Sequence, residues 1–179
     1  RDYKVTGVQT CALPISLRAL WLLALIIPLH VLSSAIADAP WMDGPYPYFA
    51  IRTLQVGVAT LLPLPLIWQF CRMQHMHGHF ALYVTVYIWL CLFWALFGAL
   101  ANGLTANVLF HISTIKAMGT TLFFVGYASH AYIAALALRC NPLVGIGVAT
   151  VVSFCAAITN DLSNIYLFGV ARPLFSVQP

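Results

Sequence analysis

The chain has 179 residues, of which 62% are hydrophobic and 7% are charged, and its mean hydropathy is +0.92. Water-soluble domains are about 45–50% apolar and about 25% charged, so this composition excludes a soluble globular protein. The formal net charge of +4 comes from scattered Lys and Arg residues, and without a basic run we expect no nucleic-acid partner. The sequence predicts an all-α, polytopic transmembrane helix bundle of five to six spans, with the lipid bilayer as its surroundings.

The first sixteen residues are set apart from this bundle. Residues Val5–Ile15 (VTGVQTCALPI) resemble the conceptual translation of a common sequencing-library adapter. We therefore interpret residues 1–16 as an artefact and exclude them from reasoning about the fold, as is done for expression scars. Residues 17–179 are then the bundle, and we expect it to be incomplete.

The apolar stretches set the spans, because a bilayer core about 30 Å thick needs about 20 apolar residues in a helix. Five spans are predicted in chain order: Leu17–Ala37, Phe49–Phe70, Phe80–Ala101, Gly119–Leu138 and Pro142–Ile158. Prolines in the second span predict a kink near Pro63. Residues Asn102–Met118 fit either a bent extension of the third span or an interfacial helix. Residues Asp161–Phe175 are a candidate sixth span.

The basic residues indicate the orientation, since Lys and Arg favour the cytoplasmic side. If the first span starts in the cytoplasm, the residues on that side are Arg18, Arg72, Arg139 and Arg172. Arg52 and Lys116 fall on the other side. This bias favours a cytoplasmic start of the first span, with the inverted orientation as the alternative. We expect a multi-pass protein of the cell inner membrane.

Histidines are the most conspicuous candidates for chemistry. His75 and His79 would share one helix face and His77 lies between them, which suits metal ligation with Cys71 as a further ligand. A solvated histidine run at the membrane surface is the favoured interpretation. His130 in the fourth span and His30 in the first are candidates for a ligand-linked or proton-linked role, because ionisable groups inside a membrane are often functional. Hydrogen-bonded packing is the favoured interpretation for both.

Two charged residues lie near the ends of spans. We expect Arg52 to extend its guanidinium to the interface, and pairing with Asp161 or Asp43 is the alternative. For Asp161 we expect a helix cap before the last segment, rather than an ion or substrate site.

Small residues recur every fourth position along the fifth span, at Gly145, Ala149, Ser153 and Ala157. A strip of this kind lets another helix approach closely. We expect packing within the chain, with a homodimer interface as the alternative.

Two families are similar to parts of the chain. The run Phe97-Gly-Ala-Leu-Ala-Asn102, the span Leu122–Arg139 and the tail Asn160–Leu174 resemble the bacterial membrane-associated sensor domain found ahead of histidine kinases and diguanylate cyclases. This resemblance implies a sensor without catalysis that signals to a cytoplasmic output domain. The opening span, from Arg18 to His30, resembles that of membrane acyltransferases that modify surface sugars, which would make His30 a catalytic base.

We expect the first of these functions, a sensory or anchoring module of a signalling protein. No nucleophile elbow, metalloprotease motif or phosphate-binding loop occurs in the sequence, so we expect no catalysis and no cofactor. A small-solute transporter is the main alternative, since the prolines of the second span would give a broken helix of the kind that lines transport sites. The acyltransferase ranks third.

Overall fold

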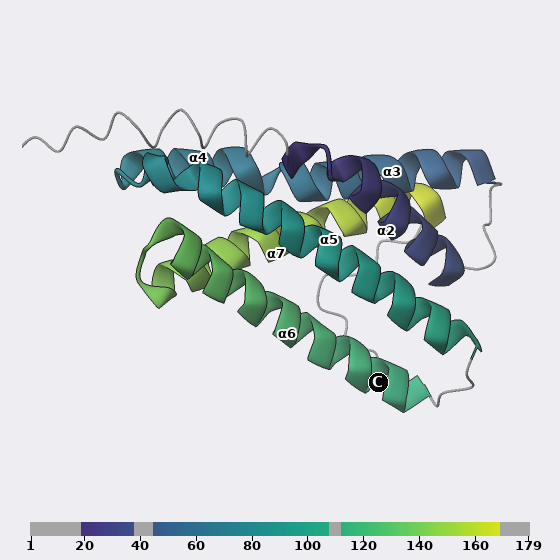
Figure 1. The fold of residues 1–179 in the computed structure, drawn as a ribbon. Helices are drawn as coiled ribbons and strands as arrows, with labels where there is room; N and C mark the ends of the chain where they lie inside the picture. Colours follow the sequence, from purple (N-terminus) through teal and green to yellow (C-terminus); the bar gives the residue numbers. More distant parts are fainter. Residues whose placement is uncertain (1–18, 38–44, 108–111, 169–179) are drawn as a thin grey trace, which may run out of the picture.

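A computed structural model describes residues 19–37, 45–107 and 112–168, and within these ranges the regular structure is helical, with no strand. The helices are α2 (Leu23–Ala37), α3 (Pro45–Leu61), α4 (Pro63–Met73), α5 (His77–Asn107), α6 (Ile112–Leu138) and α7 (Pro142–Phe168). The expected all-α fold class is confirmed at this level. Figure 1 shows long helices running along the molecule.

Four helical segments are long and apolar enough to cross a membrane: Pro47–Met73, Gly78–Gly103, Ala117–Leu138 and Pro142–Tyr166. Their surfaces carry large apolar side chains in the open, for example Leu54 (68% exposed) and Phe124 (63% exposed). Such a surface is stable in lipid and unfavourable in water. These features indicate a membrane protein. They match the second to fifth predicted spans, with boundaries shifted by up to three residues, except that the fifth continues from the predicted end at Ile158 to Tyr166.

Helix α2 is the shorter apolar helix. Its 15 residues extend about 22 Å, which is less than a bilayer core of about 30 Å. Residues Trp21 and Leu22 form a turn before it, where Leu22 N–H donates to the Ala19 carbonyl at 3.0 Å. The described part of the predicted first span is thus helical but interrupted.

Proline explains the division between α3 and α4. Pro63 has no N–H to continue the helix ladder, and the residue before a proline is sterically restricted. The interruption falls at Leu62, whose angles (φ −57°, ψ −38°) remain right-handed helical, so both helices form one continuous span. The interruption lies where the sequence predicts a kink, and the kink itself stays a prediction.

Both turns at one end of the bundle have the same hydrogen bonding. His75 and Arg139 adopt left-handed angles, with φ of 56° and 52°. The following amides close the turns, because Met76 N–H donates to Cys71 O at 2.8 Å and Cys140 N–H donates to Ala135 O at 3.0 Å. These are Schellman motifs, which usually have glycine at the left-handed position.

Packing joins α2 to α3 and α5, α5 to α6, α6 to α7, and α7 back to α3, while α4 contacts α3, α5 and α7. The largest fully buried side chains include Tyr83, Tyr87 and Ile88 of α5, Ile26 of α2 and Leu138 of α6. The two tight turns lie together at one end of the molecule, and the start of α3 and the end of α7 lie at the other (Figure 1).

Three expectations about chain segments need correction or completion. Helix α7 continues to Phe168, so no separate sixth span begins at Asp161 and that residue is not an N-cap. The orientation argument that used Arg172 depended on this sixth span, and Arg172 lies outside the described residues. Of the ambiguous Asn102–Met118, α5 extends to Asn107, and α6 begins at Ile112.

Candidate functional site

A buried arginine joins α3 to α7 near one end of the bundle. Arg52 is only 5% exposed, and it lies about 8 Å along the span from Pro47. Its Nη1 donates to Gln55 Oε1 at 2.6 Å and to Ser163 Oγ at 3.4 Å, and its Nη2 donates to Asn164 Oδ1 at 3.1 Å. The guanidinium carbon lies 5.7 Å from the centre of the Tyr48 ring, within cation–π range.

The outer edge of this polar cluster reaches the surface of the bundle. Gln55 Nε2 donates to Asn160 Oδ1 at 3.0 Å in an exposed position. Ser163 is held in turn, because its hydroxyl donates to the Asn160 carbonyl at 2.8 Å. We call Arg52, Gln55, Asn160, Ser163 and Asn164 the Arg52 cluster.

These bonds explain why α7 does not end where the sequence predicts. The segment Thr159–Asn164 is polar, and polar side chains of this kind compete with the helix backbone. Here they are occupied by bonds along the helix and by the two long polar side chains of α3. The helix therefore passes through the segment, and Asp161 is an interior residue with a buried Oδ2 that has no hydrogen-bond partner among the described residues.

The position of Arg52 differs from the favoured expectation. Its side chain turns into the bundle and contacts α7, instead of extending to the interface. It therefore resembles the alternative, pairing across the bundle, although the described acceptors on α7 are neutral. Asp43, the other proposed partner, lies outside the described residues.

The two histidines inside apolar helices are half-buried. His130 Nδ1 lies 2.8 Å from the Gly126 carbonyl of its own helix, and its ring meets the Tyr87 ring edge-on at 5.9 Å between centroids. These contacts are what hydrogen-bonded packing requires. A ligand-linked or proton-linked role for His130 or for His30 of α2 stays a prediction.

The histidine run lies at the α4–α5 turn. His75 is in the left-handed turn position, while His79 lies in α5, so the two do not share one helix face. Cys71, the suggested further ligand, is completely buried in the core. In the described residues no three His, Cys, Asp or Glu side chains lie close enough to hold a metal. The side chain of His77 lies outside the described residues, and metal binding stays a prediction.

The small-residue strip brings α7 against α6. A Cβ added at Gly145 would collide with the Ala131 carbonyl oxygen and lie 2.9 Å from the Ala135 Cβ. Ala149, one turn further, is completely buried, while Ser153 and Ala157 are half-buried. The expected packing within the chain is therefore found at the start of the strip.

Two further polar contacts were not identified from the sequence. Tyr87 donates its hydroxyl to the Thr60 carbonyl at 3.1 Å, just before the interruption at Leu62. Asn102 Nδ2 donates to Ser33 Oγ of α2 at 2.8 Å. The prolines signalled that a carbonyl near position 60 would need a partner, but nothing in the sequence indicated which residue would supply it.

The described cysteines are reduced and unpaired with one another: Cys71, Cys91, Cys140 and Cys155. Cys140 lies in the α6–α7 turn, where burial raises the pKa of its thiol. A protonated thiol is a poor nucleophile. This environment provides no activated cysteine.

The Arg52 cluster is consequently the strongest candidate site. A guanidinium presents donors in a planar fork that matches a carboxylate or phosphate. Its described partners on α7, Ser163 and Asn164, are neutral, and a hydrogen bond to an anion is about twice as strong as one to a neutral group. Comparisons with protein-family models, with curated proteins and with solved structures found no match to this chain.

Proposed function

We propose that this chain is the sensory module of a multi-pass signalling protein in the cell inner membrane, and that it has no catalysis of its own. Five segments would lie across the bilayer: the predicted first span Leu17–Ala37, of which the shorter α2 is a part, the combined α3–α4 span, α5, α6 and α7. The ends carrying Arg72 and Arg139 would face the cytoplasm, in keeping with the preference of basic residues for that side.

The observation that carries this proposal is the burial of Arg52 between two helices that are far apart in the sequence. A charged side chain in a membrane bundle is costly to keep, and such residues commonly mark sites of function. Arg52 is 5% exposed and contacts Ser163 and Asn164 of α7. It therefore couples the position of α7 to that of α3.

A small anion offers a way to change this coupling. A carboxylate entering at the exposed Gln55–Asn160 edge would compete with Asn164 for the guanidinium, because charge-assisted hydrogen bonds are about twice as strong as neutral ones. Losing the α3–α7 bonds would free α7 to shift. The shift would reach the α6–α7 turn at the proposed cytoplasmic end, where an output domain can respond. A second copy of the chain, paired through the transmembrane helices, is a further proposed partner.

A small-solute transporter is the second candidate, and the interruption of the span at Leu62 favours it, since broken helices often line transport sites. Against this, the Thr60 carbonyl next to the break is occupied by Tyr87, and both Tyr87 and Pro63 are buried.

Binding and uptake measurements separate the two functions. The chain is reconstituted into proteoliposomes and tested with radiolabelled succinate and acetate, which are small carboxylates. The sensor predicts saturable binding without accumulation inside the vesicles, with binding lost in Arg52→Gln and kept in Arg72→Gln, a matched variant at the other end. Accumulation that needs the chain would favour the transporter. Binding that is unchanged in Arg52→Gln would contradict the proposed site.

A further inference from the structure

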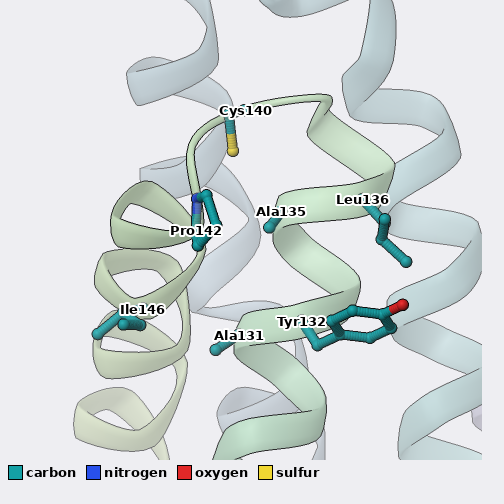
Figure 2. A pocket seen from close by; sticks show the side chains of 7 residues that line it. All are labelled: Ala131, Tyr132, Ala135, Leu136, Cys140, Pro142 and Ile146. Atoms are coloured by element: carbon teal, nitrogen blue, oxygen red, sulfur yellow. The ribbon is translucent and has the colours of Figure 1, made fainter.

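An apolar groove lies on the outer face of the α6–α7 hairpin, far along α7 from the Arg52 cluster. Its volume is about 240 Å³. Figure 2 shows how it is built: Ala131 and Ala135 form a floor of small side chains between the two helices, Leu136 lies on one side, Ile146 on the other, and Cys140 is at the turn.

The groove opens toward the surroundings of the bundle. Leu136 is 59% exposed and Ile146 is 45% exposed, so the two sides of the groove belong to the outer apolar surface. The helices approach closely at Gly145, where a Cβ would collide with the Ala131 carbonyl. An apolar groove on the outer surface of a membrane protein is in contact with the hydrocarbon chains of the bilayer.

The turn adds positive charge at the end of the groove. Arg139, which precedes Cys140, is exposed and sits in the left-handed position of the Schellman motif. A left-handed angle is unfavourable for a residue with a Cβ, and glycine is the usual occupant. Backbone strain of this kind is often found where a side chain is needed at a functional position.

The nearby charges are of one sign. Arg72 is exposed at the neighbouring α4–α5 turn, which lies at the same end of the bundle (Figure 1). Asp161 is the one acidic residue in the described ranges, and it lies about 28 Å from Pro142 along α7. The end of the bundle at the groove is thus complementary to a negative headgroup.

We propose that this groove is a binding site for an anionic phospholipid, with one acyl chain on the Ala131–Ala135 floor and the phosphate at Arg139. Basic sites between transmembrane helices on the cytoplasmic side are suited to anionic lipids. The site needs the membrane placement of the helices but not the sensory role, and it lies at the opposite end from the Arg52 cluster.

Native mass spectrometry of the chain released from nanodiscs tests the proposal. The discs contain equal amounts of phosphatidylglycerol and phosphatidylcholine, and the lipid retained by the protein is counted by mass. Wild type should retain phosphatidylglycerol preferentially. Arg139→Gln should lower this preference about five-fold, which corresponds to about 1 kcal/mol for one basic residue near an anionic surface.

Two matched pairs of variants control for general effects. Ile146→Trp fills the groove and should reduce retained lipid, whereas Leu143→Trp, at a residue outside the groove that is 73% exposed, should not. Arg72→Gln removes an equal charge at the neighbouring turn, outside the groove, and should lower the preference less than Arg139→Gln does. An equal loss in Arg72→Gln and Arg139→Gln would overturn the site in favour of general surface attraction. No preference in wild type, or unchanged retention in Ile146→Trp, would also overturn it.

Discussion

The contact between α6 and α7 at Gly145 can be tested by adding a single methyl group. In Gly145→Ala the new Cβ would collide with the Ala131 carbonyl oxygen, which is backbone, and lie 2.9 Å from the Ala135 Cβ. Neither neighbour is the end of a flexible side chain, so the helices must move apart. Overpacking of this kind costs about 1–3 kcal/mol.

Gly147→Ala is the matched control, since a Cβ added there meets nothing within 4 Å. Both substitutions place alanine in the same helix, and both gain about 1 kcal/mol from helix propensity. The difference between the two variants therefore isolates the contact, and we expect Gly145→Ala to be less stable than Gly147→Ala by about 1–3 kcal/mol. The assay is unfolding of the purified chain in mixed micelles by titration with a denaturing detergent, followed by circular dichroism. Equal stability of the two variants would refute the close approach of α6 and α7.

Three further predictions concern hydrogen bonds, backbone strain and thiol chemistry. Tyr87→Phe should lower the unfolding free energy by about 1–3 kcal/mol because the Thr60 carbonyl loses its partner. Tyr83→Phe should have a smaller effect in the same unfolding assay. A larger loss of stability in Tyr83→Phe than in Tyr87→Phe would count against this role of Tyr87. Arg139→Gly should raise the free energy of unfolding by about 0.5–1 kcal/mol, since glycine relieves the left-handed strain at φ 52°. A melting temperature lower than that of the wild type would contradict the strained geometry. Burial raises the pKa of the Cys140 thiol, so the rate of its alkylation by iodoacetamide should keep rising with pH above about 8.5, the pKa of a free cysteine. The Cys140 signal is identified by its loss in Cys140→Ser. A rate that levels off near pH 8.5, about the pKa of a free cysteine, would show that the thiol is not shielded.

Much of the helical arrangement could be predicted from the sequence because composition and periodicity are local signals. Apolar stretches near 20 residues long marked the four long segments, and Pro63 marked the interruption of the second. The observed helix ends differ from the predicted ones where no capping residue is evident in the sequence. The end of α4, for example, depends on the left-handed angle of His75, which the residue type does not announce.

The candidate site was predicted only in part because it depends on contacts between distant segments. Arg52 was singled out as a charge near the end of a span, but its burial required Ser163 and Asn164 to lie opposite it, more than 100 positions later in the chain. The same contacts let α7 continue past Asp161, where the sequence alone suggested a cap. A polar segment that resembles a helix end in the sequence can therefore lie inside a helix when its side chains have hydrogen-bond partners on another helix.

The membrane placement of the bundle is the central claim, and labelling of single cysteines tests it most directly. In a background without the native cysteines, His75→Cys, Tyr166→Cys and Trp89→Cys are expressed in cells and treated with a membrane-impermeant maleimide, before and after the membrane is opened. His75 and Tyr166 lie toward opposite ends of the bundle, and Trp89 is 56% exposed near the middle of the segment Gly78–Gly103. We predict that Tyr166→Cys is labelled in intact cells, that His75→Cys is labelled only after opening, and that Trp89→Cys is protected in both. Labelling of His75→Cys and Tyr166→Cys from the same side, or ready labelling of Trp89→Cys, would contradict a bundle that spans the membrane.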